Sequence, residues 1–228
     1  MNSYCVIRMD LMDSRKIEHR QKIQEQLLKY LNTLNSEYDD ILVAPITIIL
    51  GDEWAIVLRD GRYAYEIYLK IKRFLWEYQI DAYAGVGFGT ILEENSDIRK
   101  MNGTAFEQAK YSLMKAKSSK YGYRKEIPTK ACHIALSGFD LQFEGRDWDE
   151  VVNTLIQNNE ILFSRVTKKQ YEMICLYERY QSYTKIIEHE PNVTKRMLSD
   201  CLNGAEYWLM KENVSLIQHI LHSILIPQ

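Results

Sequence analysis

Two apolar, β-branched runs with Gly-Asp-Glu between them make residues 46–58 the most constraining stretch of the chain. This pattern predicts a tight hairpin in a buried antiparallel sheet. Asp52 and Glu53 would then lie at the tip of strands that are too apolar to be solvated. Carboxylates held on a rigid sheet are suitable ligands for Mg²⁺. A solvated acidic turn is the simpler alternative, and a second acidic strand near the N-terminus favours the metal.

That second strand spans residues 4–15, where an apolar run leads into Asp10 and a polar turn containing Ser14 follows. Helical spacing of apolar residues after the turn predicts a helix that begins near Ile17. If this strand pairs with the hairpin, Asp10 and Asp52 face each other and two bridging metal ions would hold a triphosphate. Free backbone N–H groups at the start of the helix would bind its phosphates.

The middle of the chain predicts the remainder of an α+β sheet. A helix is expected over residues 63–78, a glycine-rich strand over 80–92, a helix with a basic side over 104–120 and a short strand over 131–136. Glycine at every second position leaves one face of the strand over 80–92 bare, which permits close approach of a ligand or of another backbone. Lys110, on the basic side of the helix over 104–120, is a candidate phosphate contact, although a solvated helix face is the simpler interpretation.

Strand signals cease after Trp148, so we expect a boundary near residue 145, with one domain over 1–145 and a helical one over 146–228. Helices over 167–180, 184–190 and from 194 onward have the layout of a helix-turn-helix module. Thr194 would cap the last of these helices, with Lys195 and Arg196 at its head facing DNA.

Charge limits the DNA prediction. Residues 165–228 contain eight Lys or Arg and seven Asp or Glu, which leaves only +1 to neutralise phosphates. Glu188 and Pro191 also stand where a sigma-factor-like module has apolar residues. A module used for protein contacts is therefore nearly as well supported as a DNA reader. The apolar stripe of the last helix, residues 205–225, would cap the module or form a dimer interface.

The motifs at residues 9–15, 50–54, 85–89 and 102–110 together resemble the SatD family of bacterial proteins. The chain also resembles the palm domain shared by class III nucleotide cyclases and GGDEF diguanylate cyclases. These resemblances imply a ferredoxin-like palm, a mainly antiparallel sheet with helices packed on it, followed by a small all-α helix-turn-helix-like domain. The residues expected to bind metal are Asp10, Asp52 and Glu53. The residues expected to bind nucleotide are Leu11, Asp13, Ser14, Arg15 and Lys110.

One departure from the cyclase pattern bears on activity. Class III cyclases carry an asparagine and an arginine that act on the transition state, and at the matching places this chain has Glu107 and Tyr111. The resemblance therefore favours binding of nucleotide and metal over cyclisation.

Composition indicates a cytoplasmic globular protein. The chain has 228 residues and a formal net charge of −2, which argues against a generally basic nucleic-acid binder. No apolar stretch is long enough to span a membrane, and the N-terminus leads into a strand, not a signal peptide. The cysteines are widely spaced, without the Cys/His spacing of a zinc site, and are expected to be reduced.

Three functions remain open. The preferred one is a regulator whose palm binds a nucleotide with Mg²⁺ and whose helical arm contacts DNA or a protein partner, with the whole protein forming a homodimer. The second is an active nucleotidyl transferase or cyclase using two metals at Asp10 and Asp52. The third is an interaction scaffold that has lost its ligand. Glu107 and Tyr111 argue against the second function, and the retained Asp10 and Asp52 against the third.

Overall fold

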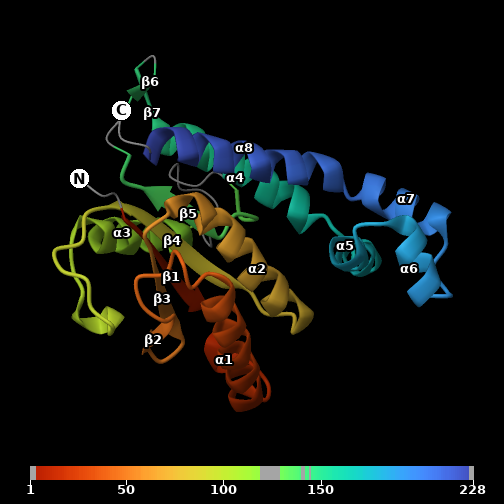
Figure 1. The fold of residues 1–228 in the computed structure, drawn as a ribbon, viewed down its shortest axis with the longest axis horizontal. Helices are drawn as coiled ribbons and strands as arrows, with labels where there is room; N and C mark the ends of the chain where they lie inside the picture. Colours follow the sequence, from red (N-terminus) through yellow and green to blue (C-terminus); the bar gives the residue numbers. More distant parts are fainter. Residues whose placement is uncertain (1–3, 119–128, 140–141, 144, 226–228) are drawn as a thin grey trace.

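The fold was obtained as a computed structural model, which describes residues 4–118, 129–139, 142–143 and 145–225. It is an α+β fold with one mixed five-stranded sheet and, within the described residues, eight α-helices. Figure 1 shows helices on both faces of the sheet and an arm of helices that extends to one side. In this part of the chain, none of the helices is long and apolar enough to cross a membrane.

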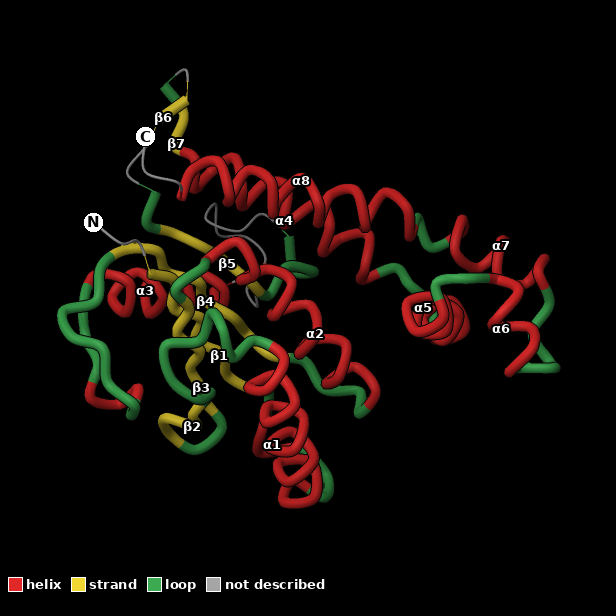
Figure 2. Tube along the Cα trace, viewed as in Figure 1, coloured by secondary structure: helices red, strands yellow, loops and turns green. Residues whose placement is uncertain are grey.

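The sheet has the strand order β2-β3-β1-β4-β5, so the first strand in the sequence lies at its centre (Figure 2). The predicted hairpin forms β2 and β3, and all neighbouring strands are antiparallel except β4 and β5, which are parallel. The strands are β1 (Tyr4–Leu11), β2 (Thr47–Leu50), β3 (Glu53–Leu58), β4 (Ala82–Gly89) and β5 (Ile134–Ser137).

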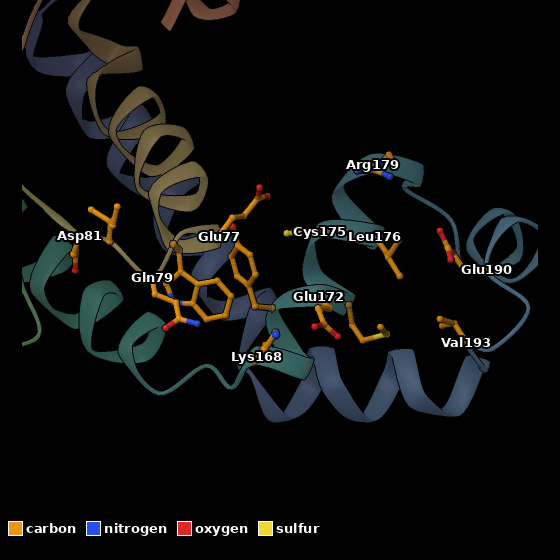
Figure 3. A pocket seen from close by; sticks show the side chains of 14 residues that line it. Glu77, Gln79, Asp81, Lys168, Glu172, Cys175, Leu176, Arg179, Glu190 and Val193 are labelled. Atoms are coloured by element: carbon orange, nitrogen blue, oxygen red, sulfur yellow. The ribbon is translucent and has the colours of Figure 1, made fainter. Parts of the chain in front are cut away.

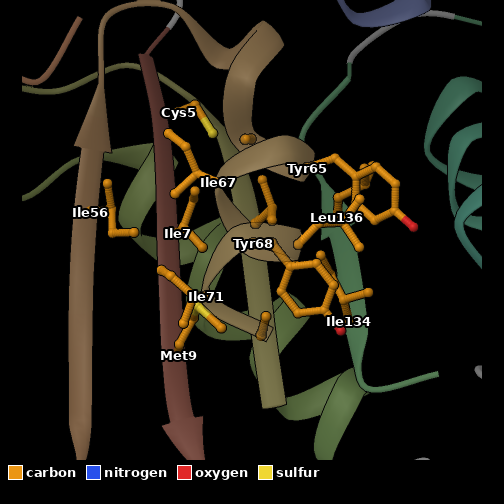
Figure 4. Close-up of a cluster of buried hydrophobic side chains, with 14 of the residues drawn as sticks. Cys5, Ile7, Met9, Ile56, Tyr65, Ile67, Tyr68, Ile71, Ile134 and Leu136 are labelled. Atoms are coloured by element: carbon orange, nitrogen blue, oxygen red, sulfur yellow. The ribbon is translucent and has the colours of Figure 1, made fainter. Parts of the chain in front are cut away.

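One face of the sheet is covered by α1 (Arg20–Glu37) and α2 (Ala64–Glu77). Alternate residues of β1, among them Ile7 and Met9, point to this face because side chains alternate along a strand. They meet fully buried residues of α2 such as Ile71, and Figure 4 shows this contact. These side chains form most of the hydrophobic core.

The opposite face carries α3 (Thr104–Ser118), which lies directly on the backbone of β4. A Cβ atom added to Gly85 would lie 2.1 Å from the backbone nitrogen of Leu113, and one added to Gly87 would lie 2.1 Å from that of Ala109. The bare face of the glycine-rich strand is thus filled by a helix, and the close approach of another backbone is the alternative that holds.

The hydrophobic core continues past the predicted boundary at residue 145. Val152 and Ile156 of α4 (Trp148–Ser164), together with Ile217 and Leu221 of α8 (Tyr207–Leu225), belong to the same buried cluster as the sheet. The division into 1–145 and 146–228 stays a prediction, but these two helices pack on the N-terminal part. A small hairpin precedes α4, formed by β6 (Gln142–Phe143) and β7 (Arg146–Asp147).

The three predicted helices of the arm are α5 (Lys168–Tyr180), α6 (Tyr183–His189) and α7 (Lys195–Gly204). Their ends agree with the prediction to within a residue or two, because local capping fixes them. Thr167 and Gln170 form a capping box at α5, and the Thr194 hydroxyl accepts a hydrogen bond from the backbone N–H of Met197 at α7. Met173, Ile186, Val193 and Leu198 form a separate small core of this arm.

The helix after β1 begins later than predicted. Residues Ser14–Lys16 form only a short 3-10 turn (η1), and Ile17 is extended. The long helix starts at Arg20, preceded by His19 in the left-handed conformation. The prediction was wrong here because the spacing of apolar residues from Ile17 onward does not reveal that the backbone between Ile17 and His19 is not helical. Two further 3-10 turns are η2 (Gly61–Tyr63) and η3 (Ile98–Lys100).

Candidate functional site

Four polar side chains lie in a row across the α3 face of the sheet, one from each of four neighbouring chain segments. Asp10 of β1 is directly opposite Glu53 of β3 on one side and Tyr83 of β4 on the other. Directly opposite residues of antiparallel strands share a face. The Tyr83 ring meets the ring of His133, which precedes β5, with centroids 5.6 Å apart. We call Glu53, Asp10, Tyr83 and His133 the polar row.

The alternation along β5 places His133 on the same face. Ser137 of β5 bonds to Ser112 of α3 through hydroxyl oxygens 2.7 Å apart. Side chains two residues apart in a strand share a face, so His133 and Ser137 both lie on the α3 side. The polar row therefore spans the sheet just beyond the C-terminal end of α3.

Each carboxylate of the polar row is paired with a cation. Arg8, two residues before Asp10, donates from Nε to Oε1 of Glu53 at 2.6 Å. Lys117, in the last turn of α3, places Nζ 2.6 Å from Oδ2 of Asp10. Hydrogen bonds between ionised groups are stronger than those between neutral groups, so these two contacts fix the positions of both carboxylates and of the two cations paired with them.

The position of Lys117 follows from the glycines of β4. Because α3 lies against Gly85 and Gly87 at backbone distance, successive turns of the helix follow the strand toward its first residue. Lys117 comes one turn after Leu113, the residue above Gly85, and so reaches the level of Tyr83 and Asp10. The sequence alone did not single out Lys117.

The hairpin turn places the predicted metal ligands differently from expectation. Gly51 has the left-handed φ of +60°, and the pairing of β2 with β3 shifts between Ile48 and Leu50. Glu53, not Asp52, is the residue opposite Asp10. The predicted pairing of Asp10 with Asp52 was wrong by one residue, since Asp52 belongs to the turn and not to the paired strand.

The donors are of the type that Mg²⁺ prefers, because all three predicted ligands offer carboxylate oxygens. Asp10 and Glu53 are opposed on adjacent strands, and Asp52 lies next in the chain. Within the described ranges, however, no three His, Cys, Asp or Glu side chains come close enough together to hold a metal ion. The residues thus fit a metal in type, and their use as ligands stays a prediction.

The predicted nucleotide contacts surround the end of β1. The side chain of Leu11 is buried in the core, which leaves its backbone for any contact. Asp13 has a left-handed φ of 47°, and its carboxylate lies 3.4 Å from Nζ of Lys16. Ser14 and Arg15 form the short 3-10 turn. Lys110 is exposed on α3, two turns before Lys117 on the same side of the helix.

A second ionic group, missed in the sequence, adjoins the polar row. His133 binds Oδ2 of Asp81 through Nδ1 at 2.7 Å, and the backbone N–H of Met12 donates to the carbonyl of Asp81 at 2.9 Å. Burial alone would raise the pKa of Asp81, but the hydrogen bond with His133 and the charge of Lys72 outweigh it and lower the pKa below 3.8. Asp81 and His133 each directly precede a strand of the sheet, which was the available sequence signal.

Behind Asp81, Lys72 forms a buried ion pair with Glu160 of α4. Burial alone would lower the pKa of Lys72, but the carboxylates of Glu160 and Asp81 outweigh it and raise the pKa. The hydroxyl of Tyr68 donates to the same carboxylate oxygen that Lys72 binds, Oε2 of Glu160, at 3.0 Å. This group ties α4 to α2 and the sheet.

A family model described as the SatD family matches residues 4–203. The chain belongs to the SatD family. The match includes the hairpin, α3, the polar row and most of the arm, and it ends within α7, before α8. It crosses residue 145 without a break. No curated protein matches this SatD-family chain.

The arm of the SatD-family chain exposes the residues predicted to contact DNA. Thr194 caps α7, and Lys195 and Arg196 are exposed in its first turn. The Arg196 guanidinium lies 3.5 Å from the carboxylate of Asp200, one turn later, and both side chains are mostly exposed. A pair this exposed is weak and easily exchanged for another partner.

Proposed function

We propose that this SatD-family protein is a regulator that binds a nucleotide together with Mg²⁺ at the polar row. In this proposal the helices α5 to α7 contact DNA or a protein partner, and the protein acts in the cytoplasm. The observation that carries the proposal is the opposition of Asp10 and Glu53 on neighbouring strands, with Lys117 and Arg8 each bonded to one of them.

This arrangement of charges suits a ligand that brings both signs. Two carboxylates and two cations neutralise each other while no ligand is bound. On binding, Asp10 and Glu53 would turn to a cation while Lys117 and Arg8 would turn to phosphate oxygens. Each pair would thus exchange its partner without leaving a charge unpaired, which avoids the cost of an isolated partly buried charge. Mg²⁺, when bound, would neutralise part of the phosphate charge.

The connection of the strands supports the palm assignment. The elements β1, α1, β2, β3, α2 and β4 follow the β-α-β-β-α-β order of ferredoxin-like folds, and the strand order is β2-β3-β1-β4. Helices α1 and α2 cover one face. We infer that these elements form the palm and that β5, α3 and the later helices are additions to it.

The choice between DNA and a protein partner rests on charge. The exposed cations at the head of α7 suit phosphate contacts, whereas the arm as a whole carries a net charge near zero. Glu107 and Tyr111 are exposed on α3, and neither side chain can replace the asparagine and arginine of the cyclases. We therefore favour binding over cyclisation.

Calorimetric titration with ATP and GTP, with and without Mg²⁺, tests the nucleotide site. We expect the wild type to bind at least one nucleotide, more tightly with Mg²⁺. The variant Asp10→Asn with Glu53→Gln, which removes both carboxylates of the polar row, should weaken binding by at least about tenfold, or about 1.4 kcal/mol.

The matched control is Asp39→Asn with Asp40→Asn, which removes the same charge from an exposed turn away from the polar row. This control should bind like the wild type. Binding that is indifferent to Mg²⁺ and to the first pair of substitutions would reject the proposed site.

A further inference from the structure

A cleft of about 870 Å³ separates the turn between α2 and β4 from helix α5 and the α6–α7 turn. None of the four residues of the polar row lines it, although Asp81 of its lining bonds to His133. Its walls come from segments far apart in the sequence. In Figure 3, Asp81 and Gln79 lie at one end and Glu190 and Val193 at the other, with α5 between them. The volume is in the range of pockets that hold small organic molecules.

The cleft has an apolar lining with two aromatic rings. Trp76 of α2 and Tyr171 of α5 contact each other, with ring centroids 3.9 Å apart. The other apolar residues that line the cleft are Ile80, Met173, Leu176 and Val193. Aromatic and aliphatic walls of this kind bind the apolar body of a ligand.

Carboxylates outnumber cations around this lining. Asp81, which is bonded to His133, and the three glutamates Glu77, Glu172 and Glu190 line the cleft, against Lys168 and Arg179. In the part of the chain that the structure describes, none of these three glutamates forms a salt bridge. They are therefore available to a ligand.

Glu190 is the best placed of the three. It is half-buried, whereas Glu77 and Glu172 are exposed, so its charge is less screened by water. It follows α6 and lies at the same end of the cleft as Val193. A carboxylate beside an apolar wall fits the ammonium group of an amphipathic molecule.

We propose that this cleft binds an amphipathic organic amine, with its ammonium group at Glu190 and its apolar body along the lining of α5, from Leu176 toward Tyr171. The proposal for the cleft does not depend on the proposed function, because none of the residues that carry it belongs to the polar row.

Two probes of matched shape test the charge preference. Tryptamine and indole-3-acetate share the indole ring and differ in the sign of the charged group. In calorimetric titrations of the full chain, we expect tryptamine to bind and indole-3-acetate to bind at least about tenfold more weakly. Absence of tryptamine binding at millimolar concentration, or equal affinity for the two probes, would overturn the proposal.

Substitution of one glutamate locates the binding. Glu190→Gln keeps the size of the side chain and removes its charge, and it should weaken tryptamine binding by about tenfold. Glu188→Gln is the matched control, because Glu188 is exposed on α6 and does not line the cleft. It should leave tryptamine binding unchanged.

Equal losses in the Glu190→Gln and Glu188→Gln variants would overturn the placement of the amine. Asp10→Asn should bind tryptamine like the wild type, and this result separates the cleft from the polar row. Circular dichroism of each variant confirms that the helical content is retained, so a loss of binding reports on the cleft.

Discussion

Nζ of Lys117 lies 2.6 Å from Oδ2 of Asp10, although one residue ends α3 and the other ends the first strand. Both side chains are partly exposed, so the pair contributes little to stability. Its importance lies in position, since it places a cation beside the carboxylate that we propose as a ligand. The contact exists because α3 lies on β4 without intervening side chains.

Lys117→Met distinguishes the contribution of this lysine to stability from its contribution to nucleotide binding. We expect the free energy of unfolding in urea to fall by less than about 1 kcal/mol, because the ion pair is exposed. Affinity for the Mg²⁺–nucleotide complex should fall at least about fivefold. Lys115→Met, which removes another cation of α3, is the control and should leave that affinity unchanged. An unaltered affinity in Lys117→Met would remove this lysine from the proposed site.

Gly85→Ala should be strongly destabilising. The added methyl group would lie 2.1 Å from the backbone nitrogen of Leu113 and would push α3 away from the sheet. We expect a loss of at least about 3 kcal/mol in unfolding free energy, the upper range for overpacking. Gly51→Ala is the comparison, because it has open space but a positive φ and should cost only about 1–2 kcal/mol. Similar losses in the two variants would refute the close contact.

The Lys72–Glu160 pair should behave as a coupled buried unit. Lys72→Met leaves the carboxylate buried without its cation, and we expect unfolding free energy to fall by about 3–5 kcal/mol. Adding Glu160→Gln removes the unpaired charge while keeping groups that can bond to Tyr68. The double variant should therefore be more stable than Lys72→Met alone, as measured by urea unfolding. An additive double-variant cycle would show that the two residues do not interact.

Asp81 should make stability depend on pH in the acid range. Its pKa is lowered in the folded protein, because the hydrogen bond with His133 and the charge of Lys72 outweigh burial. A carboxyl with a lowered folded pKa stabilises the fold above its unfolded pKa, close to 3.8, and this contribution is lost as the pH falls through the folded pKa. The free energy of unfolding of Asp81→Asn should thus be lower than that of the wild type at pH 7, and the difference should be smaller near pH 3. A difference in unfolding free energy between variant and wild type that does not change with pH would contradict this prediction.

Reversal of two charges tests whether the arm binds DNA, as one form of the proposed function requires. Lys195→Glu with Arg196→Glu should abolish retention of duplex DNA in fluorescence anisotropy without unfolding the protein, since both side chains are exposed. Lys22→Glu with Lys29→Glu makes the same charge change on α1, away from the arm. Unchanged retention in the first variant would leave a protein partner as the target of α7.

Local signals made the arm and the hairpin predictable. Thr167 and Thr194 cap their helices through side chains only three residues away from the groups they bind, so the sequence contains the whole interaction. The hairpin is likewise specified by two adjacent apolar runs and Gly51. SatD-family membership agrees with the motifs that suggested it.

Long-range packing made the rest of the site unpredictable. Nothing near Lys117 in the sequence indicates Asp10, because the contact depends on the approach of α3 to the glycines of β4. The pairing of Asp10 with Glu53, and not Asp52, depends on where the turn ends and the ladder begins. The contact between His133 and Asp81 joins residues 52 positions apart, so neither residue indicates the other in the sequence.

Asp81 joins parts of the molecule that are otherwise separate. Its carbonyl holds Met12, just after β1, and its carboxylate holds His133, just before β5. The same residue is also part of the cleft wall. One residue of the cleft wall thus fastens the end of β1 and the start of β5, so a displacement of this turn would act on two strands of the sheet at once.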